Sequence, residues 1–77
     1  MDERYQQMMD AMPRKVDLTT FEIAKLLSKS PRTIARMIDD GEFGPEGTAW
    51  FWTKAGRGRG SRKVRAKYVR DWLKRNA

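Results

Sequence analysis

Residues 18–43 read LTTFEIAKLLSKSPRTIARMIDDGEF, and this stretch has the pattern of two helices separated by a short turn. The first helix begins with a capping box, because Thr19 is followed three residues later by Glu22. A helix is therefore expected over residues 20–28. Its apolar residues are expected to form one buried stripe made of Phe21, Ile23, Ala24 and Leu27.

The second helix opens at Ser30 and Pro31, a pair typical of an N-cap and the first helical position. The residues spaced to share its buried face are Ile34, Met37 and Ile38. Gly41 is expected to end the helix in the left-handed conformation. The two helices are then joined by a turn of about three residues, 28–30, which indicates a helix-turn-helix.

The sequence changes character after this stretch. AWFWT at 49–53 is typical of a short strand, and RKVRA at 62–66 of a second one. Between them AGRGRGS is too rich in glycine for a strand interior and predicts a loop. Helical spacing resumes from residue 65 or 66 to residue 75. The predicted fold class is α+β, mainly α: a winged helix-turn-helix with a two-stranded wing hairpin and a short C-terminal helix.

The chain is expected to divide into an N-terminal tail or short helix, residues 1–15, and one winged helix-turn-helix domain, residues 16–77. The first segment ends at Pro13. Its apolar residues at three- and four-residue spacing are Tyr5, Met8, Met9 and Met12. A chain of 77 residues has room for one modest core.

Two tryptophans lie in the first wing strand. Strand alternation places Trp50 and Trp52 on one face and Phe51 on the other. Large aromatic rings are usually buried, so both tryptophans are expected in the core. Base stacking by an exposed ring is the alternative.

The charge is strongly one-sided. The net charge is +7, from 17 basic and 10 acidic side chains. Between Lys54 and Arg75 the only acid is Asp71, among many lysines and arginines, whereas residues 39–46 hold Asp39, Asp40, Glu42 and Glu46 and no base. A basic cluster favours a polyanionic partner, because each neutralised phosphate releases counterions. A merely solvated surface is the alternative.

Cysteine and histidine are both absent. This removes disulfides, thiol chemistry, the usual zinc sites and the commonest general base. We therefore expect no enzyme activity, no cofactor and no metal. The sequence has no long apolar run, so neither a signal peptide nor a membrane span is expected and a cytoplasmic protein is favoured.

The chain resembles the excisionase (recombination directionality factor) family of the MerR-like winged helix-turn-helix group. The resemblance covers roughly residues 16–75. The matching residues are Leu18, Thr19, Glu22, Ala24, Leu27, Thr33, Ile34, Arg36, Ile38, Gly41, Val69, Trp72 and Leu73. The link between Gly41 and Trp50 departs from the pattern, since it is longer and more acidic than the short link typical of the group.

This resemblance implies a protein that loads on attachment-site DNA, bends it and assists an integrase in excision. The implied partners are double-stranded DNA, an integrase and neighbouring copies of the chain, with no membrane and no small-molecule ligand. A phage or plasmid transcription regulator, or a DNA-binding protein like a terminase small subunit, has the same fold and stays as an alternative. A basic RNA-binding protein is a third hypothesis.

The side chains that face outward from the second helix are the candidates for reading DNA bases. Arg32 and Arg36 lie one turn apart, and arginine can form two hydrogen bonds to guanine. Thr33 can contact a phosphate or a thymine methyl group, and Ser30 precedes free helical N–H groups suited to a phosphate. The full set of expected DNA-binding residues is Thr19, Lys25, Lys29, Ser30, Arg32, Thr33, Arg36, Arg57, Arg59, Arg62, Lys63 and Arg65.

The wing tip carries Arg57 and Arg59 between glycines, which would let the backbone approach DNA closely. Insertion into a narrow minor groove and clamping of phosphates are both open. An RGG-like RNA-binding tip is a further alternative. The basic residues of the second wing strand are expected to follow the phosphate backbone.

Overall fold

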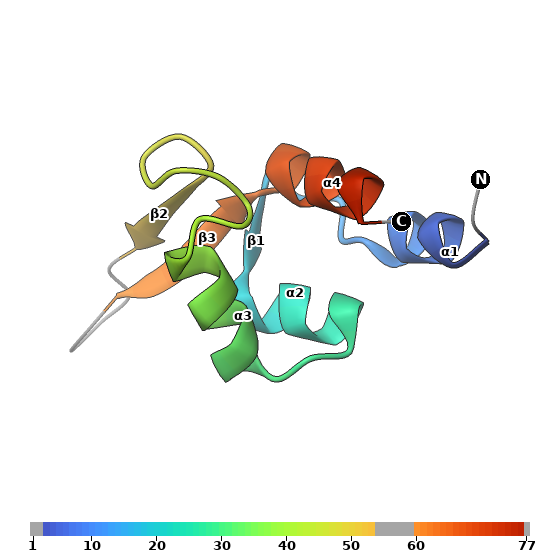
Figure 1. Ribbon diagram of the computed structural model, residues 1–77, viewed down its shortest axis with the longest axis horizontal. Helices are drawn as coiled ribbons and strands as arrows, with labels where there is room; N and C mark the ends of the chain where they lie inside the picture. Colours follow the sequence, from blue (N-terminus) through green and yellow to red (C-terminus); the bar gives the residue numbers. More distant parts are fainter. Residues whose placement is uncertain (1–2, 54–59, 77) are drawn as a thin grey trace.

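The computed structural model describes residues 3–53 and 60–76 (Figure 1). The helices of this part are α1 (Glu3–Ala11), α2 (Thr20–Leu27), α3 (Pro31–Asp39) and α4 (Ala66–Arg75). Its strands are β1 (Asp17–Thr19), β2 (Trp50–Thr53) and β3 (Ser61–Arg65). The two helices of the predicted helix-turn-helix, both wing strands and the closing helix are therefore all present, which confirms the winged helix-turn-helix.

The sheet has one strand more than the sequence predicted. The described strands form an antiparallel sheet in the order β1-β3-β2, with β3 in the centre. Val64 of β3 lies opposite Leu18 of β1 on one side and Trp50 of β2 on the other. β1 ends at the residue before α2 begins, so it joins the start of the helix-turn-helix directly to the central strand of the wing.

The N-terminal ends of α2 and α3 agree with the sequence prediction. In α2 the backbone N–H of Glu22 donates to the hydroxyl of Thr19 at 3.1 Å, and the N–H of Thr19 donates to the Glu22 carboxylate at 2.9 Å. In α3 the N–H of Thr33 donates to the Ser30 hydroxyl at 3.1 Å, with Pro31 at the first helical position. Local hydrogen bonds thus fix where each helix begins.

The C-terminal end of α3 is closed by a Schellman motif. The N–H of Gly41 donates to the carbonyl of Ile38 at 3.0 Å, and the N–H of Glu42 to that of Met37 at 3.1 Å. Gly41 has φ +80°, the left-handed conformation that glycine adopts without strain. This confirms Gly41 as the residue that ends the helix.

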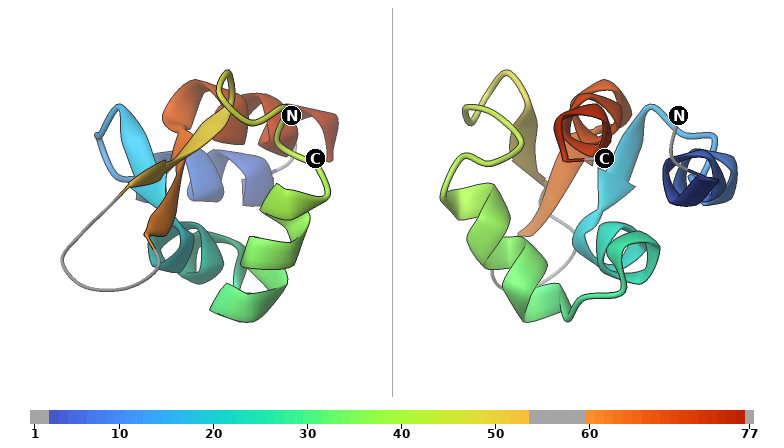
Figure 2. Two further views of the ribbon diagram at one scale, coloured as in Figure 1. Left: turned by 90° about the vertical axis from the view of Figure 1, so that its left-hand side faces the viewer. Right: turned by 45° about the vertical axis from the view of Figure 1, so that its right-hand side comes forward.

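The core lies between the sheet and the helices. Leu18, Ile34, Ile38, Val64 and Val69 are fully buried. Figure 2 shows α2 and α3 together at the lower side of the molecule, with α4 at the upper side. The other buried apolar residues are Met12, Ile23, Ala24, Leu27, Met37, Phe43, Ala49, Trp50, Ala66 and Leu73.

The prediction that Phe21 belongs to the core is wrong. The residue is 71% exposed. Residues follow one another at 100° around a helix, so Phe21 lies about 110° from the middle of the stripe made by Ile23, Ala24 and Leu27. That angle carries its ring away from the core and into solvent.

The prediction for the tryptophans is right for Trp50 and wrong for Trp52. Trp50 is 5% exposed and lies opposite the fully buried Val64, whereas Trp52 is 45% exposed and lies opposite Arg62. The two rings stay in edge-to-face contact, with centroids 5.8 Å apart. β2 extends past the edge of the core, so strand alternation alone does not bury Trp52.

The N-terminal segment contributes one helix to the fold. α1 lies at one end of the molecule, beside α4 and α2 (Figure 1). Met8 and Met9 pack against the core, and Met12 is buried in it. The division into segments 1–15 and 16–77 stays a prediction.

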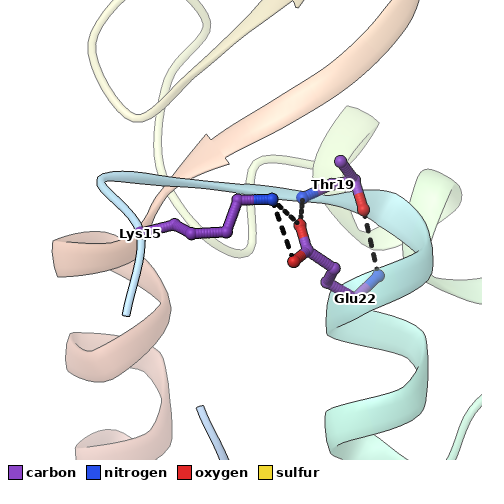
Figure 3. A network of polar contacts seen from close by, with 3 residues as sticks. All are labelled: Lys15, Thr19 and Glu22. Atoms are coloured by element: carbon purple, nitrogen blue, oxygen red, sulfur yellow. Dashed lines mark hydrogen bonds and ion pairs between the residues drawn. The ribbon is translucent and has the colours of Figure 1, made fainter. Parts of the chain in front are cut away.

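The capping box of α2 makes stability depend on pH. The ammonium group of Lys15 lies 2.9 Å from the Glu22 carboxylate, which also accepts the backbone N–H of Thr19. Figure 3 shows the three residues together. The hydrogen bond from the backbone N–H of Thr19 lowers the pKa of Glu22 most, and Lys15 lowers it further. Burial raises the pKa, but by less than the Thr19 N–H lowers it, so the pKa lies below its ordinary value. A lowered pKa in the folded state stabilises the protein above the unfolded pKa, and this stabilisation is lost as the pH falls through the folded pKa.

We therefore expect the free energy of unfolding to fall less in Glu22→Gln than in the wild type between about pH 7 and about pH 3. Glutamine keeps the capping hydrogen bond but carries no charge, and the other acids titrate in both proteins. Urea unfolding at the two pH values measures the difference. Equal losses in both proteins would contradict a role for the Glu22 charge.

Candidate nucleic-acid interface

The exposed face of α3 carries the residues predicted to read bases. Arg32, Thr33 and Arg36 are exposed, whereas Ile34 is fully buried. Arg32 and Arg36 are four residues apart, so their side chains leave the same face of the helix. The Ser30 and Thr33 hydroxyls lie 2.8 Å apart and hydrogen-bond each other. α3 therefore presents two guanidinium groups on one exposed face, with a pair of hydroxyls beside Arg32 at its start.

The predicted DNA-binding residues before α2, within it and in the following turn differ in their freedom to bind DNA. Lys25 and Lys29 are exposed. Thr19 is half-buried, and its hydroxyl already accepts the N–H of Glu22. The backbone of the turn is fixed by Ser28, which has φ 55°, and by the Lys29 N–H, which donates to the Ala24 carbonyl at 2.9 Å.

The three predicted residues of β3 do not share one face. Arg62 lies on the same face as the buried Val64, whereas Lys63 and Arg65 lie on the opposite face because side chains alternate along a strand. The guanidinium of Arg65 lies 5.8 Å from the ring centroid of Phe51 on that opposite face. The structure therefore separates Lys63 and Arg65 from Arg62, instead of bringing all three together.

Arg62 joins the wing to the end of α3. Its Nε donates to one carboxylate oxygen of Asp39 at 2.9 Å, and its Nη2 donates to the other at 2.7 Å. The guanidinium also lies 4.5 Å from the ring centroid of Trp52. Asp39 is the last residue of α3, so this two-point contact joins the wing strand to the end of α3.

A family model described as a helix-turn-helix domain matches residues 18–77. The chain belongs to this helix-turn-helix family. The family includes excisionase-like DNA-binding proteins, and it assigns sequence-specific binding of double-stranded DNA to the protein. The comparisons with curated proteins and with solved structures gave no match.

The match of the helix-turn-helix domain begins at Leu18, in β1, and runs through both wing strands and α4. It therefore includes the exposed arginines of α3 and the ion pair between Arg62 and Asp39. Arg57 and Arg59, the predicted contacts of the wing tip, lie outside the described residues.

Two residues near this face were missed by the sequence analysis as functional candidates. Phe21 stands exposed at the start of α2, and its angle around the helix is the signal that could have found it. Asp39 is one of the acids in residues 39–46, and in the structure its carboxylate pairs with Arg62. That contact joins residues 23 positions apart in the chain, and no local pattern marks it.

Two kinds of feature were not found among the described residues. Within residues 3–53 and 60–76, no three acidic side chains gather into a group that could hold a metal ion. None of the helices in that part of the helix-turn-helix protein is long and apolar enough to cross a membrane.

Proposed function

We propose that the protein is an excisionase, a recombination directionality factor that loads on attachment-site DNA, bends it and assists an integrase in excision. The observation that carries this proposal is the pairing of two DNA-facing elements. Exposed arginines on α3 stand beside a wing that Arg62 and Asp39 hold in place. Membership of a family that includes excisionase-like proteins supports the same role.

The proposed division of labour follows from the chemistry of each element. α3 enters the major groove, where Arg32 and Arg36 can form paired hydrogen bonds with guanine. Arg57 and Arg59, which follow the first wing strand in the sequence, would bind in the adjacent minor groove or at the phosphates, where positive charge supplies affinity with little sequence choice. Contacts in two neighbouring grooves favour bending, because a bend brings more DNA against the protein.

The proposed role is architectural and not enzymatic. The chain has no histidine or cysteine, and the basic residues serve to bind and shape DNA. A single module of this size buries a small interface, so it binds weakly alone. We therefore infer that neighbouring copies and the integrase, bound to adjacent sites, raise the effective affinity.

Mapping the binding sites on genomic DNA tests this role. The protein is used to select fragments of its source genome, and the bound fragments are sequenced. Sites should cluster at an attachment site beside an integrase gene, and adding the protein to that integrase should raise the yield of excision. A matched reaction contains Arg36→Ala, which should give less excision.

The alternatives predict different outcomes. Sites confined to promoters, with no effect on excision, would identify a transcription regulator, and sites at packaging sequences would indicate a terminase-like role. A preference for RNA over duplex DNA in direct competition would overturn the DNA-binding hypotheses together.

A further inference from the structure

Phe21 is an exposed aromatic residue at the start of α2. Its side chain is 71% exposed, although Ile23 and Leu27 of the same helix are buried. A single exposed apolar residue is ordinary on a protein surface and needs no explanation by itself. The surroundings of Phe21 distinguish it from such a residue.

Phe21 lines an open hollow of about 370 Å³ between the helix-turn-helix and the wing. The start of α2, the start of α3 and the first residues of β3 surround this hollow, and its side chains include Arg32, Ala35 and Arg62. Arg32 and Ala35 belong to α3, and Arg32 is one of its exposed arginines. The hollow is therefore continuous with the exposed face of α3 that carries Arg32.

The hollow combines positive charge with apolar surface. Among the described residues that line it there is no acidic side chain, while Arg32 and Arg62 supply two guanidinium groups. Asp39 holds Arg62 in place, whereas Arg32 is in none of the ion pairs formed by the described residues. A DNA strand has matching chemistry, with phosphates on its outside and apolar deoxyribose and thymine methyl groups toward the grooves.

We propose that Phe21 contacts DNA, with its ring packed against apolar atoms of the strand that passes between α2 and the wing. The proposal rests on the DNA binding assigned to the family and adds an uncharged contact to it. The apolar atoms belong either to deoxyribose or to a thymine methyl group. Such a contact contributes affinity through buried apolar area and not through counterion release.

The chain offers a matched control in Val16. This residue is also apolar and is 75% exposed, but it lines a different hollow, between α1 and α4. Phe21→Ala and Val16→Ala each shorten an exposed side chain, so both variants should unfold in urea near the wild-type midpoint. They should differ only in DNA binding.

The experiment measures the affinity of the three proteins, over a range of salt concentrations, for a duplex selected from random sequences with the wild type. Phe21→Ala should bind on the order of ten-fold more weakly at every salt concentration, with the slope against salt unchanged. Val16→Ala should bind as the wild type does. Replacing thymine by uracil in the duplex separates the two kinds of apolar atom. If the ring of Phe21 contacts a thymine methyl group, uracil lowers the affinity of the wild type and leaves the affinity of Phe21→Ala unchanged. If it contacts deoxyribose, the replacement affects the two proteins equally.

Two results would overturn the proposal. One is wild-type affinity in Phe21→Ala, and a change of oligomeric state of that variant in ultracentrifugation would then assign Phe21 to a contact between copies. The other is an equal loss of affinity in Val16→Ala. If the wild type itself selects no duplex, the DNA binding fails as well, and that outcome is distinct from the other two.

Discussion

Replacing Gly44 with alanine is expected to lower the free energy of unfolding by about 2–5 kcal/mol. Gly44 has φ +136°, in a conformation that L-residues rarely adopt. A Cβ atom there would lie 2.5 Å from the Cβ of Ala49 and 3.4 Å from Cδ1 of Tyr68. Ala49 is fully buried and cannot move aside cheaply, so backbone strain and overpacking add together. A domain of this size has little stability to lose.

Gly47 provides the matched control, because it lies in the same loop and also has a positive φ, +88°. A Cβ atom at Gly47 would meet nothing within 4 Å. Gly47→Ala should therefore show the backbone strain alone, about 1–2 kcal/mol. Urea unfolding of the two variants measures the difference. Equal losses would contradict the close approach of Gly44 to Ala49.

Replacing Arg36 with alanine is expected to lower the affinity for the specific duplex by about 1–3 kcal/mol and to relax the choice of base at one position. Arg36 is exposed on α3, one turn from Arg32, and we expect its guanidinium to reach a base edge once α3 lies in the major groove. Its side chain takes no part in the core, so the fold should stay intact. Affinities for the specific duplex, for single-base variants and for random duplex give the required comparison.

Arg70→Ala is the matched control for charge. Arg70 is an exposed arginine of α4, and α4 lies on the other side of the molecule from α3 (Figure 2). Removing it lowers the net charge by the same amount and should reduce binding to specific and random duplexes alike, by a small factor. Should Arg36→Ala also weaken both duplexes equally, Arg36 contacts a phosphate and not a base.

Local features of the chain could be predicted well because their interactions lie close together in the sequence. The capping box joins Thr19 and Glu22, which are three positions apart, and the Schellman motif at Gly41 depends on hydrogen bonds to the preceding turn. The outward position of Arg32 and Arg36 follows from the same periodicity that buries Ile34. Helical spacing alone therefore identified Arg32 and Arg36 as candidates for contacting DNA bases.

Contacts between distant segments could not be predicted in this way. β1 is only three residues long, which is too short to show alternation, and it exists because Leu18 lies opposite Val64 in the central strand. Whether Trp52 is buried or exposed depends on where the core ends beneath β2, and no pattern within β2 contains that information.

The helix-turn-helix and its exposed arginines were thus determined by the sequence itself, since capping, turn geometry and helical period act over a few residues. The placement of the wing was decided only by the tertiary structure. β1 pairs with β3, and Arg62 reaches Asp39 across 23 positions, so both contacts require the folded chain. The hollow beside Phe21 has the same origin, because three separate elements must meet to form it.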